Sequence, residues 1–402
     1  MTDNDFNPGK VLTSADQVPP RVLSAPQKYI QGAGVLNCIG QYINGLMRVD
    51  RAAIFASRRG LTTQGAQIAE SLQEYSIDVV NAQFNGECSQ AEIAMHSDAL
   101  ADQQLDCLIA VGGGKVADAG KCIAHRLNIS VIVVPTLAST DAPCSALSVV
   151  YKPEGTAESV EFFPQNPTMV VVDTDVIVSA SERYFVAGIG DAMATWYEAK
   201  VCLDNPSARN SLGALPTLAS CAMGEMCAQT LFEHGEMAAA SVLLNQNNTA
   251  VDKVIEANTL LSGIGFESGG LALAHAIALA YPEIEFIHDH YLHGEMVAMG
   301  TLAQLAMEDS RDAERVTRFF ARIGLPVHFA QISFEPDNLE AMNKLIEATL
   351  ARPIAHNMPM PVTKDSLTEA LFKAHELGLK IATDEGSEAY TRLHALSLTT
   401  TF

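Results

Sequence analysis

The stretch LDCLIAVGGGKVADAGK (105–121) joins an apolar run, three glycines and the start of a helix-like pattern. The apolar run is typical of a buried strand. Gly112, Gly113 and Gly114 allow the backbone to approach a ligand closely, and the N–H groups at the start of the next helix favour phosphate oxygens. The stretch therefore predicts a strand, a phosphate-binding turn and a helix, which is an α/β arrangement.

The glycine loop (residues 112–114) matches neither of two well-known phosphate-binding motifs. Gly120-Lys121 is followed by Cys122, and Lys115 stands where a Walker A loop needs glycine. The third glycine of the GxGxxG pattern is also absent. A flexible strand-to-helix turn that binds nothing therefore stays open as an alternative.

Short β-rich runs alternate with helix-like segments around this loop. The helix-like segments end near Glu74 and cover 89–104 and 115–126. Alternation at this spacing predicts parallel βαβ units. The last three runs follow one another without long helices, as in a hairpin insertion. In chain order the runs are 52–56, 77–84, 105–111, 130–136, 145–151, 160–163 and 168–174.

The composition changes after Asp175. Ala, Leu and Met dominate, β-branched runs disappear, and helical periodicity continues nearly to the end. We predict a polar N-terminal arm at 1–27, a nucleotide-binding α/β domain at 28–180, and a helical metal- and substrate-binding domain at 181–402.

Charge and composition exclude several classes of function. The 402 residues are 48% hydrophobic and carry a net charge of −22, which argues against disorder and against binding to nucleic acid or anionic membranes. The eight cysteines form no CxxC pair, so we expect reduced thiols. The acidic N-terminus resembles no signal peptide, and no apolar run reaches the about 18–20 residues that span a bilayer. These features predict a cytoplasmic protein.

A basic turn, Ser57-Arg58-Arg59, follows the first βαβ strand. In dinucleotide-binding folds, an acidic residue after an early strand binds the ribose 2′-OH, whereas arginine suits a 2′-phosphate. A solvated basic turn and a tolerance or preference for NADP are both compatible with this sequence. The choice between NAD and NADP therefore stays open.

The polar turn PTLASTDAPCSALS (135–148) follows a later apolar strand. Because ligands of open parallel sheets bind outside the carboxyl ends of the strands, we expect this turn to lie beside the glycine loop. Asp141 is a candidate acceptor for substrate hydroxyls, and the Thr and Ser hydroxyls are candidates to bind phosphate or nicotinamide. An ordinary turn that caps a helix is the alternative.

Candidate metal ligands lie in the helical half. Asp191 heads DAMATWYEA, His275 lies in an apolar stretch, and a histidine cluster at 288, 290 and 293 follows Pro282. The proline should interrupt the helix, so a turn could bring the cluster back towards His275. One carboxylate with two imidazoles suits Zn²⁺ or Fe²⁺. A helix N-cap for Asp191 and a core role for His275 are the alternatives.

Taken together, these segments resemble the glycerol dehydrogenase branch of the iron-containing (group III) alcohol dehydrogenase family. The similarity runs from SAPQKYIQGAG (24–34) to HNMPMPVTKDSL (356–367), and ASTDAPCSALS (138–148) and GIGFESGGLA (263–272) are its most specific stretches. The resemblance implies a Rossmann-like α/β N-terminal domain, an all-α C-terminal domain and an active site in the cleft between them. It also implies zinc, with Fe²⁺ as the alternative, and a homo-oligomer, often an octamer.

The resemblance also assigns roles to individual residues. Asp141 would contact the polyol, and His293 would lie near the substrate as well as binding metal. The metal ligands would be Asp191, His275 and His293. The residues that would line the cofactor path are Gly112, Gly113, Gly114, Lys115, Asp118, Thr136, Ser139, Ser145, Leu147 and Tyr151.

Three features depart from the family pattern. Ser57 replaces the usual acidic residue, the 275–293 stretch is one residue longer, and Met296 replaces a lysine. The second departure leaves His290 as an alternative third ligand. The expected activity is hydride transfer between glycerol, a small neutral polyol, and NAD, with NADP as the alternative cofactor, giving dihydroxyacetone. Another substrate within the superfamily, a lyase of similar architecture and a non-catalytic relative are the rival interpretations.

Overall fold

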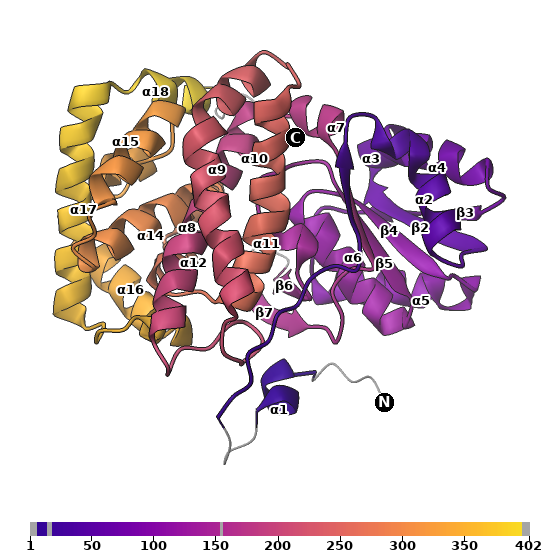
Figure 1. The fold of residues 1–402 in the computed structure, drawn as a ribbon, viewed down its shortest axis with the longest axis horizontal. Coiled ribbons are helices and arrows are strands. Elements are labelled where there is room, and N and C mark those ends of the chain that lie inside the picture. Colours follow the sequence, from indigo (N-terminus) through magenta and orange to yellow (C-terminus); the bar gives the residue numbers. More distant parts are fainter. Residues whose placement is uncertain (1–5, 14–17, 153–155, 396–402) are drawn as a thin grey trace. The chain divides into compact units, whose positions relative to one another are not determined.

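The computed structural model describes residues 6–13, 18–152 and 156–395, and its elements are labelled in Figure 1. Parts of the predicted arm (1–5 and 14–17) and the end of the predicted helical domain (396–402) lie outside the described residues. The chain forms two compact units: unit 1 comprises the described residues of Met1–Val11 and Ser24–Ala180, and unit 2 those of Leu12–Leu23 and Ser181–Phe402.

Unit 1 contains a six-stranded sheet with the order β1-β8-β5-β4-β2-β3, in which every neighbouring pair is parallel. The α/β prediction is therefore confirmed. The strands are β1 (Tyr29–Gly32), β2 (Arg51–Ser57), β3 (Asp78–Phe84), β4 (Cys107–Gly112), β5 (Ser130–Pro135) and β8 (Met169–Asp173). The helices are α2 (Ile39–Leu46), α3 (Arg58–Thr62), α4 (Gln64–Gln73), α5 (Gln90–Leu100), α6 (Gly114–Leu127) and α7 (Thr174–Val178).

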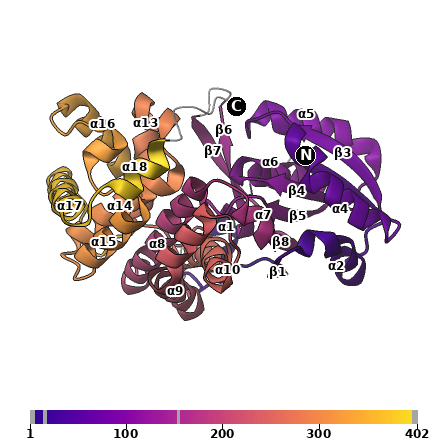
Figure 2. The ribbon, with the colours of Figure 1, turned by 90° about the horizontal axis from the view of Figure 1, so that it is seen from above.

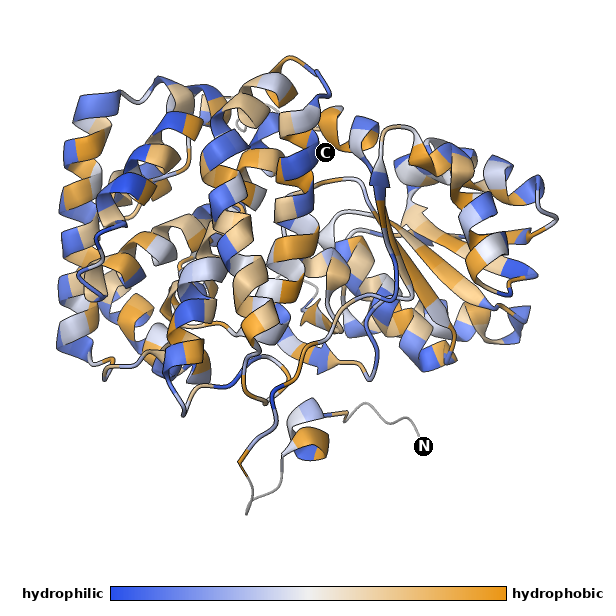
Figure 3. Cartoon of the chain, viewed as in Figure 1, coloured by the Kyte–Doolittle hydropathy of each residue, from blue (hydrophilic) through white to orange (hydrophobic). Residues whose placement is uncertain are grey.

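Both faces of this sheet are covered by helices. Phe55 of β2 points to the side of α5 and α6, whereas Ile54 points to the side of α2 and α4. The two helical layers can be followed in Figure 2, and Figure 3 colours the central strands as hydrophobic along most of their length. Burial on both faces explains why these strands are continuous apolar runs.

The predicted hairpin insertion is also confirmed. β6 (Leu147–Tyr151) and β7 (Ala157–Phe162) form a separate antiparallel pair. β6 packs against α6, where the Ser148 hydroxyl donates to the Asp118 carbonyl at 3.0 Å. The hairpin is therefore attached to the helix that follows the glycine loop.

The regular elements of unit 2 are helices among its described residues, as predicted, and one isolated β-bridge accompanies them. Two segments, Ala257–Leu261 and Gly265–Gly269, widen into π-helix, and Pro282 lies in a 3₁₀ turn that ends the helix carrying His275. The helices are α8 (Glu182–Asp204), α9 (Leu218–Leu243), α10 (Thr249–Glu256), α11 (Ser262–Ile264), α12 (Leu273–Ala280), α13 (Glu285–His290), α14 (His293–Met307), α15 (Ala313–Ile323), α16 (Leu339–Leu350), α17 (Lys364–Glu385) and α18 (Glu388–Ala395).

The described parts of the predicted N-terminal arm form regular structure that its sequence does not predict. Residues Pro8–Leu12 form the short helix α1, and Arg21 forms a parallel bridge with Leu215 of unit 2. The Leu215 N–H donates to the Pro20 carbonyl at 2.9 Å. Proline supplies no N–H, but its carbonyl still accepts, which is how a proline-containing segment attaches here.

All eight cysteines are free and all but Cys38 are buried, as expected for reduced thiols. Among the described residues, no single helix combines the length and apolar composition needed to cross a membrane. One bent pair, Thr249–Gly269 with Leu273–Glu283, passes that test on length and composition alone.

Candidate active site

The glycine loop follows β4 and leads into α6, as the sequence predicts. Gly112, Gly113 and Gly114 are half-buried, so their backbone remains accessible. A Cβ added at Gly113 would lie 3.2 Å from the Leu137 side chain, and one at Gly114 would lie 3.6 Å from the Thr140 hydroxyl. The loop thus offers bare backbone and the N–H groups at the start of α6, a combination that fits the pyrophosphate of a dinucleotide.

A fourth glycine, Gly120, supports this arrangement and was missed by sequence reasoning. A Cβ at Gly120 would lie 2.5 Å from the Ala110 side chain of β4. The third glycine of a dinucleotide-binding fingerprint usually allows the helix to pack closely against the strand. The small residues Ala110 and Gly120 are the feature of the sequence that could have predicted this close packing.

The polar turn lies beside the glycine loop, which confirms that prediction. The Thr136 N–H donates to the Gly112 carbonyl at 3.0 Å. Thr136, Ser139 and Thr140 are half-buried, so their hydroxyls are placed to meet a ligand. Asp141 is only 8% exposed and precedes a 3₁₀ turn without a side-chain cap to it, so the capping alternative has no support.

Asp118, predicted to hold the cofactor, instead faces the protein interior. Its carboxylate lies 3.0 Å from the Lys121 ammonium and 3.3 Å from the Val149 N–H. Burial raises the pKa of Asp118, and Lys121 opposes that rise. Because Lys121 is also buried and reaches the Ala142 carbonyl at 3.1 Å and the Ser145 hydroxyl at 3.3 Å, the pair fastens α6 to the polar turn.

Four other predicted cofactor residues divide between surface and interior. Lys115 is exposed, pairs with Glu87 at 2.6 Å and lies 5.3 Å from the centre of the Tyr151 ring. Ser145 is fully buried and donates to the Ala142 carbonyl. Leu147 contributes its carbonyl, which accepts from Lys121. Lys115 and Tyr151 can therefore meet a ligand, whereas Ser145 and the Leu147 carbonyl shape the turn.

Three predicted metal ligands converge in unit 2. The ligand atoms of Asp191, His275 and His293 all lie within 4.8 Å of one another. Asp191 Oδ1 is 3.3 Å from His275 Nε2 and 3.5 Å from His293 Nε2. Asp191 and His275 are buried, whereas the His293 side chain is 34% exposed. The donor set fits Zn²⁺ or Fe²⁺, and three protein ligands leave room for a further one.

Asp191 lies in the middle of α8, so the N-cap alternative is wrong. His275 is likewise more than a core residue, because both ring nitrogens face carboxylates. His290 is exposed and its Nδ1 bonds to the Phe286 carbonyl at 2.9 Å. It therefore lies outside the three-residue cluster, and His293 takes the third position.

Glu198 is a further residue of this site that sequence reasoning missed. Its Oε2 accepts from His275 Nδ1 at 2.5 Å, and its Oε1 accepts from the backbone N–H groups of Ala272 and His275, each at 2.8 Å. Glu198 follows Asp191 by two helical turns in DAMATWYEA, so the shared helix face was the available signal.

The electrostatics of the two histidines differ. Burial lowers the pKa of His275, but the charge of Glu198 and hydrogen bonds to Asp191 and Glu198 outweigh it, so this pKa stands well above its usual value. Burial lowers the pKa of His293, with Asp191 opposing that change. His293 is therefore neutral near pH 7, the form in which imidazole binds metal.

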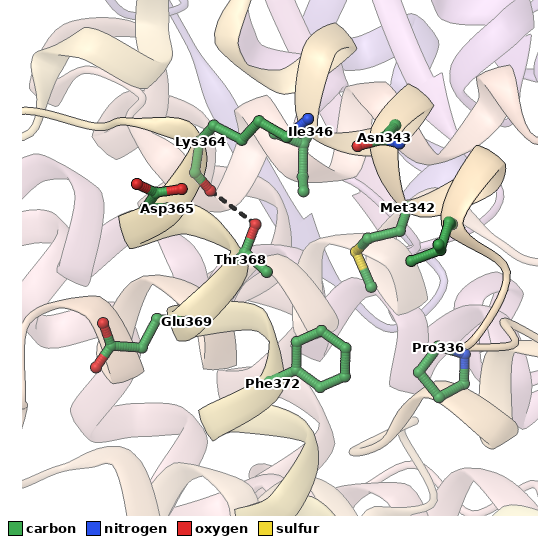
Figure 4. Close-up of a pocket in the computed structure, with 10 residues that line it drawn as sticks. Pro336, Met342, Asn343, Ile346, Lys364, Asp365, Thr368, Glu369 and Phe372 are labelled. Carbon is green, nitrogen blue, oxygen red and sulfur yellow. Dashed lines mark hydrogen bonds between the residues drawn. The ribbon is translucent and has the colours of Figure 1, made fainter.

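A separate hollow lies between α16 and α17, lined by Met342, Ile346 and Phe372 (Figure 4). At its rim the Thr368 hydroxyl donates to the Lys364 carbonyl at 2.7 Å. No predicted site residue lines this hollow, and it takes no part in the chemistry considered below.

Comparison with known proteins gives consistent matches. The family model described as iron-containing alcohol dehydrogenase matches residues 26–174. The chain is 40% identical to glycerol dehydrogenase from Escherichia coli O6:H1 over 361 residues, which are 89% of this chain and 97% of that protein. It is also 40% identical to glycerol dehydrogenase from Thermotoga maritima, covering 88% of this chain and 96% of that protein.

A solved structure shows the same fold. The crystal structure of glycerol dehydrogenase from Schizosaccharomyces pombe matches with a TM-score of 0.86 at 33% identity, covering 91% of this chain and 93% of that chain.

Proposed function

Because the chain belongs to the iron-containing alcohol dehydrogenase family, we propose that it is a glycerol dehydrogenase. The proposed reaction transfers a hydride between glycerol and NAD(P) and yields dihydroxyacetone. The observation that carries the proposal is the cluster of Asp191, His275 and His293, in a chain that is 40% identical to glycerol dehydrogenases over most of its length.

Asp191, His275 and His293 would hold a divalent cation, with zinc as the proposed metal and Fe²⁺ as the alternative. When bound, such a cation acts as a Lewis acid towards an alcohol oxygen and lowers the pKa of its hydroxyl group. Glu198 accepts a hydrogen bond from His275 Nδ1 and so directs Nε2 towards Asp191. The partly exposed His293 leaves one side of the cluster accessible to a small molecule.

The proposed cofactor site consists of the glycine loop, which would bind the pyrophosphate, and the polar turn, which would bind the nicotinamide half. Thr136 and Ser139 offer hydroxyl groups there, and Lys115 offers a positive charge near Tyr151. Asp118 and Ser145 would act indirectly, because their side chains hold the turn in place.

In the oxidation of glycerol, the C–H bond at C2 breaks and its electron pair moves with the hydrogen to the nicotinamide. The proton of the C2 hydroxyl group is transferred to water, and the carbon–oxygen bond at C2 becomes a carbonyl. Asp141 would accept a hydrogen bond from a neighbouring hydroxyl, which favours a polyol over a simple alcohol. Holding the reacting groups in one geometry is the main contribution of such residues.

The test is a substrate screen on zinc-loaded protein with NAD and NADP in parallel, using glycerol, 1-propanol, a hydroxy acid and a phosphorylated polyol. We expect the highest kcat/KM for glycerol. Asp141→Asn should raise KM for glycerol about tenfold, the effect of one hydrogen bond to a charged group, and change KM for 1-propanol less. Asp98→Asn, an exposed change on α5, is the control. Equal losses on both alcohols would contradict the role of Asp141.

Two other expectations stay predictions: the homo-octamer and the cytoplasmic location. Sedimentation of the purified protein measures the first, and cell fractionation measures the second.

A further inference from the structure

The basic turn Ser57-Arg58-Arg59 lies at the topological switch point of the sheet. From β2 the chain moves to β3 on one side, and then returns to place β4 on the other side of β2. The crevice of a doubly wound sheet opens at the carboxyl ends of the two strands where the order reverses. Here those ends are Ser57 of β2 and Gly112 of β4.

The basic turn and the glycine loop are neighbours in this crevice. Ala56 is in register with Val111, so the residues that follow each of them leave the sheet side by side. A Cβ added at Gly60 would lie 3.8 Å from the Val111 carbonyl oxygen. A dinucleotide whose pyrophosphate sits on the glycine loop and whose nicotinamide meets the polar turn after β5 must extend its adenosine towards β2, on the opposite side of β4.

The side chains at this position suit an anion. The residue at the carboxyl end of β2 is Ser57, which carries no charge, and its Oγ accepts from the Gly60 N–H at 3.1 Å. Arg58 and Arg59 are exposed, and their guanidinium groups have neither an ion pair nor a hydrogen bond among the described residues. Both charges are therefore available to a ligand.

The local charge contrasts with that of the whole chain. The net charge is −22, yet no acidic residue occurs between Asp50 and Glu70 in the sequence. Glu87, which follows the neighbouring strand β3, is paired with Lys115 at 2.6 Å. The two arginines thus stand in a stretch of sequence without acidic residues, which favours an anionic ligand there.

We infer that Ser57, Arg58 and Arg59 form a binding site for the 2′-phosphate of NADP(H), and that this chain prefers NADP(H) to NAD(H). The inference rests on the proposed dehydrogenase function. A carboxylate at Ser57 would accept from a ribose 2′-OH but repel a phosphate, whereas the serine side chain removes the repulsion. Guanidinium groups bind phosphate oxygens through charge-assisted hydrogen bonds.

The test measures dissociation constants directly. Zinc-containing protein is added to NADPH and to NADH, and the change in nicotinamide fluorescence is followed. We expect a Kd for NADPH at least about tenfold below that for NADH, the effect of one hydrogen bond to a charged group. The double variant Arg58→Ala/Arg59→Ala should lose that difference through weaker NADPH binding, with NADH binding unchanged.

Two further variants sharpen the result. Ser57→Asp should weaken NADPH binding at least about tenfold through charge repulsion and hydrogen-bond loss, and should strengthen NADH binding. Arg48→Ala, an exposed arginine of unit 1 that precedes the amino end of β2, removes the same charge elsewhere and should preserve the NADPH preference.

The inference is overturned if the parent protein binds NADH as tightly as NADPH, or if the double variant weakens both cofactors equally. Oxidation of glycerol is measured separately. Preferred NADPH binding without polyol oxidation would support this site while contradicting the proposed function. Glycerol oxidation with a preference for NAD would overturn this site and leave the proposed function intact.

Discussion

At the residue scale, Glu198 fixes the tautomer and the orientation of His275, a proposed metal ligand. A carboxylate only accepts hydrogen bonds, so the His275 nitrogen that faces it, Nδ1, carries a proton. The other nitrogen, Nε2, is then directed towards Asp191 at 3.3 Å. Glu198 also accepts two backbone N–H groups at the start of α12, so one buried side chain fixes both the ring and the helix that carries it. Outer residues of this kind tune metal affinity.

Glu198→Gln should weaken zinc binding by about 10- to 100-fold, the usual effect of losing such a partner. The amide has nearly the same shape but lacks the charge that holds His275 Nδ1–H. Competition with a chelator of known zinc affinity measures the change. Glu182→Gln, a buried carboxylate at the start of the same helix that pairs with Arg392, is the matched control. Equal zinc affinity in the two variants would contradict this role.

At the element scale, the proposed metal site depends on the close approach of three helices, α8, α12 and α14. α14 contacts α8 so closely that a Cβ added at Gly294 would lie 1.8 Å from the Ala187 carbonyl oxygen. A Cβ at Gly300 would likewise lie 2.1 Å from the Ala274 carbonyl oxygen of α12. Because His293 directly precedes Gly294, the backbone contact sets how near its ring comes to Asp191.

A salt bridge reinforces the start of α14. Arg183 of α8 donates to both carboxylate oxygens of Glu295, at 2.7 and 2.8 Å, and Glu295 accepts from the Leu292 N–H at 2.8 Å. Leu292 and Glu295, which lie on either side of His293 in the sequence, are therefore both fixed by hydrogen bonds. These contacts explain how His293, a proposed metal ligand in the first position of α14, can keep a fixed position.

Gly294→Ala should lower the stability of the protein by about 1–3 kcal/mol, the usual cost of overpacking, and weaken zinc binding, because α14 must move away from α8. Urea unfolding and chelator competition measure the two effects. Gly45→Ala in α2, where an added Cβ meets nothing within 4 Å, is the control and should be neutral or stabilising by up to about 1 kcal/mol. Unchanged zinc affinity in Gly294→Ala would refute the argument.

At the scale of the whole molecule, the chemistry is divided between two units. The glycine loop and the polar turn lie in unit 1, and the three proposed metal ligands lie in unit 2. Each unit has its own core, so each ligand should stabilise the unit that binds it. A ligand that binds only the folded state at 100 times its Kd stabilises that state by about 2.7 kcal/mol.

Hydrogen exchange should distinguish the region that zinc stabilises from the region that NADPH stabilises. Zinc added to metal-free protein should slow exchange chiefly in α8, α12 and α14, whereas NADPH should slow it in peptides that contain residues 112–118 and 136–145. Exchange measured by mass spectrometry provides both maps. Asp191→Ala should lose the zinc effect and keep the NADPH effect. Zinc protection that persists in this variant would place the metal elsewhere.

Much of the secondary structure can be predicted from the sequence, because buried strands and helices require apolar residues at regular local spacings. The runs 52–56 and 105–111 are apolar since both faces of the sheet are covered. The later segments are apolar because helices such as α12 and α14 are buried along nearly their whole length. The proposed metal ligands Asp191 and His275 can be named from the sequence because their residue types occur in a stretch that resembles the family pattern. The family pattern predicts that Asp118 contacts the cofactor. In the structure Asp118 lies on α6, and its side chain points into the protein interior.

The sequence alone determined the parallel sheet, the helical second half and the candidate donor types, since strand and helix periods depend on neighbouring residues. Only the tertiary structure decided that His293 rather than His290 meets Asp191, that Glu198 stands behind His275, and that Arg58 and Arg59 flank the switch point. These outcomes depend on distances between residues far apart in the chain. Such distances are set by backbone contacts between helices and by strand order, which no local pattern records.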